Sequence, residues 1–356
     1  SPNTPLTDYA DSFYPMMALV NNNKVYKGKE LGNFDFKTDT AFHFDATKFA
    51  LWLRDNICKG KINHIKSEVK EIKTNDDGIE SLTLDNGSVI TGDLFIDCTG
   101  FKSLLLGETM KEPFISYNDI IPNNKAWATH VEYTDKEKQL EGVTNATALK
   151  NGWVWNIPLW SKIGTGYVYS DKFTTDEKAL TEFKKHLKKQ KFDTTNSKFV
   201  NIKMKIGIHK RLFVKNVVAI GLSAGFIEPL ESNGLYTVHE YIQNLTRMFE
   251  RDSIIQWDKD TFNYSCRNTF RNLAEFVSLH YALSERSDTR YWNEVINREY
   301  DTGIHELLPT QNHGFRDHMI DKMYNFRFSE LGGIGCISIG YGYLPLTDNT
   351  LRHGNK

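Results

Sequence analysis

The chain has 356 residues, of which 40 % are hydrophobic, and its formal net charge at pH 7 is −1. This length suffices for one large domain or two smaller ones, and the hydrophobic content allows a sizeable core. The nearly neutral balance of charges gives no reason to expect nucleic acid or an anionic membrane as a partner.

The four cysteines, Cys58, Cys98, Cys266 and Cys336, are widely spaced and form no CxxC motif or Cys/His cluster. Neither a metal site nor a disulfide framework is therefore expected. Free thiols fit a reducing compartment, and the residues contain no signal peptide or apolar run of membrane-spanning length. We therefore expect a cytoplasmic protein.

Regular elements are predicted from Phe42 onward. Asp45 can cap a helix that runs to about Ile57, because a carboxylate accepts hydrogen bonds from first-turn amides. Three successive strands are predicted at residues 62–72, 79–84 and 89–90. The turn Asp85-Asn86-Gly87 joins the last two as a hairpin.

A short apolar run from Leu94 to Cys98 ends in Thr99-Gly100. This pattern predicts a buried parallel strand followed by a tight turn. A glycine here lets the backbone approach a ligand closely. The alternative is that Gly100 only permits the turn.

Residues 128–173 contain short alternating segments, which predict an antiparallel sheet on the substrate side of the protein. Trp153 and Trp155 should share one face of their strand, because side chains alternate along a strand. Spacing alone favours an aromatic pair in a core.

The remainder of the chain is largely helical in pattern. An amphipathic helix is predicted at residues 174–189, and its lysines 184, 185, 188 and 189 are interpreted as a solvated face. Further helices are predicted at residues 235–249, 262–283, 291–297 and 313–327, and residues 334–344 close the domain. His313 and His318 are interpreted as surface residues, since five positions do not place them on one helical face.

The central stretch runs from Gly221 to Leu235, after the apolar run of residues 217–220. A buried strand, a glycine-rich turn and a helix N-terminus are expected in that order. Amides at such a turn can hold an anion, because they lack intrahelical partners. Glu228 and Glu231 flank Pro229 and favour a functional site, although a packed strand–helix corner is the alternative.

Three stretches are similar to the flavin-dependent tryptophan halogenase family. They are GLSAGFIEPLESNGL at residues 221–235, GWVWNIPL at 152–159 and DLFIDCTGFKSLL at 93–105, with weaker similarity at 42–55 and 279–292. The resemblance covers residues from about 41 to 345. It implies an α/β fold like that of FAD-dependent monooxygenases, with a Rossmann-type flavin domain, an antiparallel sheet and a helical C-terminal part.

On this resemblance, residues 1–125 and 213–250 belong to the flavin domain, residues 126–212 to the substrate-side sheet and residues 251–356 to the helical region. A fold of this type carries G-x-G-x-x-G in its first βα turn. Neither that fingerprint nor the catalytic lysine of the family is present in these residues. We therefore expect an upstream βαβ unit that contains both.

The resemblance also implies a reaction. Reduced FAD, O₂ and halide give hypohalous acid, which reaches a lysine and halogenates an aromatic substrate. Glu231 matches the glutamate that assists substitution, and Ser232 matches the serine that links the flavin region to the lysine. The backbone amides of Asn233 and Gly234 match the halide site. Asn233 stands where the family usually has a threonine, and this change could alter the size of halide that the site prefers. Chloride, bromide and iodide therefore all stay open as the halide.

The resemblance implies further contacts and partners. The residues that match flavin contacts are Val69, Thr99, Gly100, Gly221, Leu222, Ala224 and Leu235. Trp153 and Trp155 match tryptophans that separate the flavin from the organic substrate. A separate flavin reductase and a homo-oligomer are expected. Phe328-Ser329 stands where tryptophan-specific members have Phe-Trp, so phenolic, indolic or carrier-bound aromatics are open as substrates.

Two alternatives stay open at this point. The first is a flavin-dependent aromatic hydroxylase on the same scaffold, although the turn Gly221-Leu222 lacks the usual Gly-Asp of that class. The second is a flavin-free protein that binds an aromatic ligand or a protein partner, which the missing glycine-rich loop favours.

Overall fold

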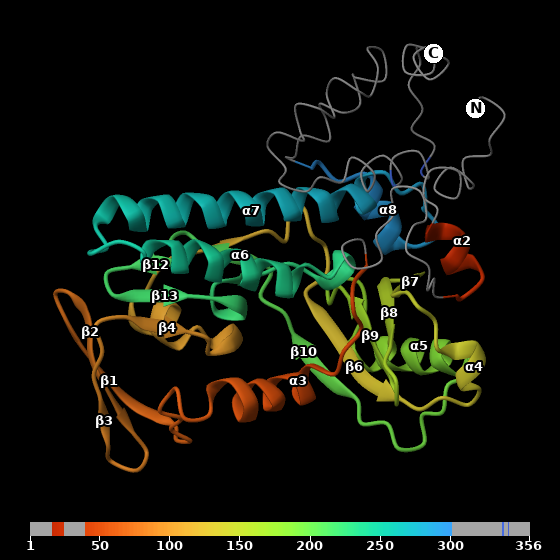
Figure 1. Cartoon of the computed structure of the whole chain (residues 1–356). Coiled ribbons are helices and arrows are strands. Elements are labelled where there is room, and N and C mark those ends of the chain that lie inside the picture. Colours follow the sequence, from red (N-terminus) through yellow and green to blue (C-terminus); the bar gives the residue numbers. More distant parts are fainter. Residues whose placement is uncertain (1–15, 25–39, 301–336, 338–340, 342–356) are drawn as a thin grey trace, which may run out of the picture. The chain divides into compact units, whose positions relative to one another are not determined.

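The computed structural model describes residues 16–24, 40–300, 337 and 341 (Figure 1). The chain divides into two compact units, the first formed by residues 1–43, 122–203 and 275–356 and the second by residues 44–121 and 204–274. The four segments expected from the sequence are a finer division and stay a prediction. No helix in the described ranges is long and apolar enough to cross a membrane.

The first unit contains a five-stranded antiparallel sheet in the order β10-β6-β9-β8-β7. Its strands are β6 (Lys125–Val131), β7 (Asn145–Leu149), β8 (Gly152–Pro158), β9 (Ile163–Tyr169) and β10 (Val200–Lys203). Its helices are α2 (Met16–Asn21), α4 (Lys136–Gln139), α5 (Asp176–Lys189) and α8 (Arg290–Ile296). The antiparallel sheet expected over residues 128–173 is therefore present.

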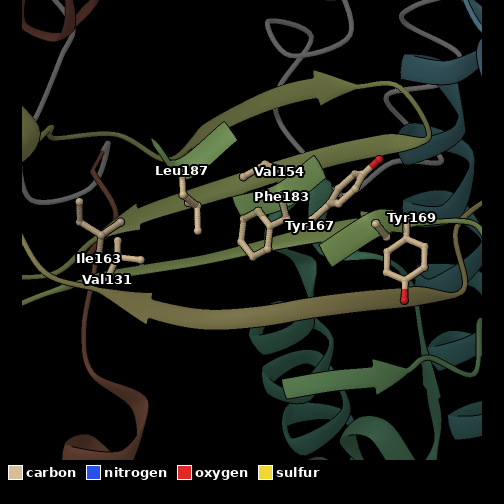
Figure 2. Packing of buried hydrophobic residues seen from close by; sticks show 8 residues of the cluster. Val131, Val154, Ile163, Tyr167, Tyr169, Phe183 and Leu187 are labelled. Atoms are coloured by element: carbon tan, nitrogen blue, oxygen red, sulfur yellow. The ribbon is translucent and has the colours of Figure 1, made fainter. Parts of the chain in front are cut away.

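Helix α5 covers one face of this sheet. Thr175 caps the helix by accepting a hydrogen bond from the amide of Lys178, as expected for a threonine at that position. Ala179, Phe183 and Leu187 lie four residues apart, so they share one helical face and are fully buried. Figure 2 shows Phe183 and Leu187 among the buried side chains of the sheet. The four predicted surface lysines of α5 are exposed.

Two buried tyrosines of β9 fix α5 on the sheet. The Tyr167 hydroxyl donates to Glu182 Oε2 at 2.9 Å, and the Tyr169 hydroxyl donates to Asp176 Oδ1 at 2.8 Å. Burial raises the pKa of both phenols far above their usual range. The two hydroxyls therefore stay protonated as donors to the helix.

The second unit contains three three-stranded sheets. Their orders are β1-β2-β3, β14-β11-β5 and β12-β13-β4. The strands are β1 (Val69–Asn75), β2 (Gly78–Leu84), β3 (Val89–Ile90), β4 (Phe95–Asp97), β5 (Phe114–Ser116), β11 (Gly207–His209), β12 (Phe213–Val214), β13 (Val217–Ala219) and β14 (Gly225–Phe226). The hairpin turn at residues 85–87 and strands β2 and β3 confirm the sequence prediction.

One predicted strand was wrong over most of its length. Strand β1 begins at Val69, whereas residues 62–68 are not a strand. Ile62 and Ile65 are 60 % and 41 % exposed. No described strand pairs with residues 62–68, and apolar character alone does not make a strand.

The helices of the second unit also differ in detail from expectation. Asp45 caps α3 (Ala46–Trp52) as predicted, and the chain continues as a π-helix, Leu53–Cys58. Helix α6 (Asn233–Met248) begins two residues earlier than predicted, and α7 (Gln256–Ala282), whose last residues lie in the first unit, begins six residues earlier. The predicted helix at 313–327, both of its histidines and Phe328-Ser329 lie outside the described residues.

Candidate functional site

Two glycine turns leave the same edge of one sheet. Strands β4 and β13 are parallel neighbours, with Phe95 opposite Val217 and Asp97 opposite Ala219. Because parallel strands end at the same edge, their carboxyl ends bring the Thr99-Gly100 and Gly221-Leu222 turns together. The two 3₁₀ turns that follow, Gly100–Lys102 and Gly221–Ser223, contact each other.

The parallel strand expected at residues 94–98 is confirmed as parallel but is buried on one face only. Phe95 and Asp97 are 7 % and 0 % exposed, whereas Ile96 is 47 % exposed. The reason is that β4 pairs only with β13 among the described strands, so it forms an edge of its sheet.

The glycines of both turns adopt left-handed backbone conformations. Gly100 has φ of +71° and Gly221 has φ of +76°, values that favour glycine. A Cβ at Gly100 would meet no atom within 4 Å, and a Cβ at Gly221 would meet only Val238 Cγ2 at 3.7 Å. The Gly100 backbone therefore faces open space that a flat or anionic ligand group could fill.

Asp97 organises the first turn, although the sequence reasoning did not select it. Its carboxylate is fully buried; Oδ1 accepts from the amide and hydroxyl of Thr99 at 3.0 and 2.6 Å. Oδ2 accepts from the amides of Leu105 and Leu106 at 2.8 and 2.9 Å. An acidic residue inside an apolar strand was the available signal, because buried carboxylates need such partners.

Two serines join the first turn to the second. The Ser103 hydroxyl donates to the carbonyl oxygen of Ser223 at 2.8 Å and accepts from the amide of Gly107 at 3.1 Å. The Ser223 hydroxyl, which is buried, lies within hydrogen-bond distance of the carbonyl oxygens of Asp97 and Ile220. Neither serine was selected from the sequence, because a lone serine carries no spacing signal.

The two glutamates beside Pro229 have opposite environments. Glu228 is 0 % exposed, whereas Glu231, at the end of the 3₁₀ turn Pro229–Glu231, is exposed. Ser232 follows with φ of +52°, and helix α6 begins at Asn233. Of the two carboxylates, only that of Glu231 is accessible in the second unit.

The N-terminus of α6 carries the features of an anion site. The Ser232 side chain makes no capping hydrogen bond, and the first turn of the helix contains no acidic residue. A Cβ at Gly234 would meet no atom within 4 Å. Amides at a helix N-terminus attract negative charge, so an anion can approach this turn. The Asn233 side chain, by contrast, is buried and contacts the Glu228 carbonyl oxygen at 3.5 Å.

The other residues proposed for the flavin lie in different settings. Ala224 is fully buried, and its carbonyl oxygen accepts from the amide of His209 at 3.0 Å. Leu222 and Leu235 are 42 % and 54 % exposed. Val69 lies opposite Leu84 in the sheet β1-β2-β3, a different sheet from that of the glycine turns. The role of Val69 stays a prediction.

Trp153 and Trp155 lie in the first unit, on the face of β8 that points away from Val154 and the α5 core. Their ring centroids are 6.2 Å apart. Trp153 is 3 % exposed, and its indole Nε1 has no hydrogen-bond partner among the described residues, whereas Trp155 is only partly buried. The Trp155 ring lies over Gly166, its partner on β9.

The family model described as tryptophan halogenase matches residues 4–350. The chain belongs to the tryptophan halogenase family. It is 33 % identical to tryptophan 6-halogenase ThaL of Streptomyces albogriseolus over 86 % of this chain and 60 % of that protein. It is 36 % identical to tryptophan 7-halogenase RebH of Lentzea aerocolonigenes over 75 % of this chain and 51 % of that protein.

Solved structures agree with this assignment. The apo structure of VirX1 superposes with a TM-score of 0.88 and 35 % identity, covering 99 % of this halogenase-family chain and 70 % of VirX1. The structure of tryptophan 6-halogenase SttH from Streptomyces toxytricini has a TM-score of 0.76 and 30 % identity over 87 % of this chain and 63 % of that one. The fold is therefore that of the flavin-dependent halogenases, as the sequence motifs predicted. The chain spans only about half to three fifths of the curated relatives named above.

Proposed function

We propose that this chain contributes part of the flavin site and the halide-side residues of a flavin-dependent halogenase that acts on an aromatic substrate. The observation that carries the proposal is the pair of glycine turns on adjacent parallel strands, the second of which leads through Glu231 into the N-terminus of α6. Its family membership supports the same activity.

Reduced FAD is the cofactor that the proposal requires. The open backbone at Gly100, the similar glycine at 221 and the exposed Leu222 fit a flat group that rests against the two turns. When bound, reduced FAD supplies the activation of O₂ through which halide becomes hypohalous acid. The reduced cofactor would come from a separate flavin reductase.

The residues around α6 would hold and use the halide. The amides of Asn233 and Gly234 are placed at the helix N-terminus, where the helix dipole favours chloride, bromide or iodide. The Glu231 carboxylate would orient the halogen donor or accept the ring proton, a contribution that is typically worth roughly 10²–10⁴-fold. Ser232 would connect the flavin-binding turns to the catalytic lysine that is expected upstream of this chain. Trp153 and Trp155 would keep the organic substrate apart from the flavin.

The substrate class is an aromatic ring open to electrophilic substitution. The relatives named as tryptophan halogenases act on tryptophan, and indolic or phenolic rings share the required electron-rich chemistry. The clamp position at Phe328-Ser329 lies outside the described residues. We further propose that the protein acts in the cytoplasm as a homo-oligomer.

The decisive experiment uses the protein expressed from the complete reading frame that encodes this chain. It is incubated with FAD, a flavin reductase, NADH, bromide and a panel of indoles and phenols, and products are identified by mass spectrometry. A brominated product supports the proposal. Hydroxylated product would make the enzyme a hydroxylase, and absence of FAD binding would favour the flavin-free alternative.

A further inference from the structure

We propose that Asp97, Ser103 and Ser223 form a buried clasp that holds the two glycine turns as a single positioning unit. The proposal rests on the assignment of those turns to the flavin. The proposal adds that the positions of the two turns are coupled. A change in one turn therefore displaces the backbone of the other turn that faces the ligand. The three residues are positioning residues, because they act through the turns and face the protein interior.

The first part of the clasp is the Asp97 carboxylate. It accepts four hydrogen bonds from the turn that it precedes, from Thr99 and from the amides of Leu105 and Leu106. A buried carboxylate with four donors is strongly held, because each hydrogen bond to a charged group is stronger than a neutral one. The loop from Thr99 to Leu106 is thereby folded back around the end of β4.

The second part crosses between the turns. The Asp97 carbonyl oxygen accepts from the amide of Ile220 at 3.0 Å, and the Ser223 hydroxyl contacts the same carbonyl. In the other direction, the Ser103 hydroxyl of the first loop donates a hydrogen bond to the carbonyl oxygen of Ser223 in the second turn. Two serines therefore bridge the turns in opposite directions, one from each side.

Close packing behind the clasp makes it stiff. A Cβ at Gly107 would lie 3.0 Å from Ser103 Cβ and 3.1 Å from His209 Cε1, so Gly107, Ser103 and His209 pack closely and a larger residue at 107 would push against the clasp. His209 also donates its backbone amide to Ala224, directly after the second turn. A site built from residues that are locked in this way holds its ligand geometry more precisely than a free loop does.

The first test needs no ligand. Amide hydrogen exchange is measured without FAD on the protein expressed from the complete reading frame, for peptides from residues 99–107 and 221–226, in wild type and in Ser103→Ala. Loss of one neutral hydrogen bond should raise exchange by about 2- to 10-fold, and the clasp requires this rise in the second turn as well as the first.

The matched control is Thr109→Val. Its hydroxyl donates to the Leu104 carbonyl oxygen at 2.8 Å within the same loop but does not reach the second turn. Exchange in residues 221–226 should therefore stay at the wild-type rate.

Asp97→Asn, which removes an acceptor of charged hydrogen bonds, should raise exchange at Leu105 and Leu106 by about 10- to 100-fold. If Ser103→Ala raises exchange only in its own loop, the clasp is refuted.

The second test measures FAD affinity by equilibrium dialysis on the complete protein, for Ser103→Ala, Ser223→Ala and the double variant. A single unit predicts that both single variants weaken FAD binding and that the double variant is no weaker than the worse single one. Fully additive losses would refute coupling of the turns. If wild type binds no FAD, the proposed function fails, while hydrogen exchange still decides whether the clasp exists.

Discussion

Glu228 and Glu231 are the same residue type three positions apart, yet the fold gives them different environments. Glu228 is completely buried beneath the turn, and Glu231 is exposed where α6 begins. The sequence indicates both, because it shows two carboxylates around a proline. Only the turn geometry separates them, since Pro229 starts a 3₁₀ turn that rotates the second carboxylate outward.

We predict that Glu231→Gln lowers halogenated product by roughly 10²-fold or more, because the variant keeps the size of the side chain but loses the basic oxygen. Oxidation of reduced flavin should continue, so hydrogen peroxide or free hypohalous acid should still be detected. Product is measured by mass spectrometry and flavin oxidation by absorbance.

The control is Glu250→Gln, an exposed glutamate beyond the end of α6, which should leave the product yield unchanged. Wild-type product from Glu231→Gln would remove this carboxylate from the mechanism. Loss of flavin oxidation together with product would instead make it a structural part of the turn.

At the scale of elements, β8 carries two tryptophans with unequal burial. Trp153→Ala should lower the free energy of unfolding by about 3–5 kcal/mol, because Trp153 is only 3 % exposed and loss of its ring leaves a cavity. Trp155→Leu should cost less and leave flavin binding intact while it changes the product yield. A denaturant titration beside a product assay checks both, and an unchanged product yield in Trp155→Leu would show that Trp155 only packs.

The contact between Trp155 and β9 gives a second prediction with a built-in control. A Cβ at Gly166 would lie 2.0 Å from Trp155 Cη2, so Gly166→Ala must displace the ring, at a cost of about 1–3 kcal/mol. At Gly164, on the same strand, the nearest atom would be 3.8 Å away. Gly164→Ala should therefore be tolerated. A similar loss of melting temperature in both variants would show that β9 simply disfavours alanine.

The sequence predicts elements well where local chemistry decides them. Asp45 caps α3 and the turn after Leu84 closes a hairpin, both through short-range hydrogen bonds or turn preferences, and the helix predicted at residues 174–189 is present as α5. The sequence predicts less well where a residue's structure depends on a partner that is distant in the chain. Ile62 and Ile65 pair with no strand among the described residues, and Asp97 acquires its hydrogen-bond partners only when Leu105 and Leu106 fold back onto it.

At the scale of the whole molecule, the described residues of each compact unit contain one buried histidine, His186 in the first and His209 in the second. Burial lowers the pKa of both imidazoles below the usual 6.5, and Lys189 adds to the effect at His186 while Glu182 opposes it. These two imidazoles therefore bind fewer protons in the folded chain than in the unfolded chain just below pH 6.5, so their contribution to the free energy of unfolding falls as the pH drops through this range.

Paired carboxylates act in a different window, which allows the two effects to be separated. Lys125 lowers the pKa of Asp176 below its usual 3.8, so the stabilisation from this pair is lost only in stronger acid. A comparison of pH 7.5 with pH 5.5 therefore reports mainly on histidines. We predict that His186→Leu reduces the loss of unfolding free energy between these two values. The exposed His239→Gln should leave that loss unchanged, and an identical loss in wild type and His186→Leu would show that His186 does not set the acid sensitivity of its unit.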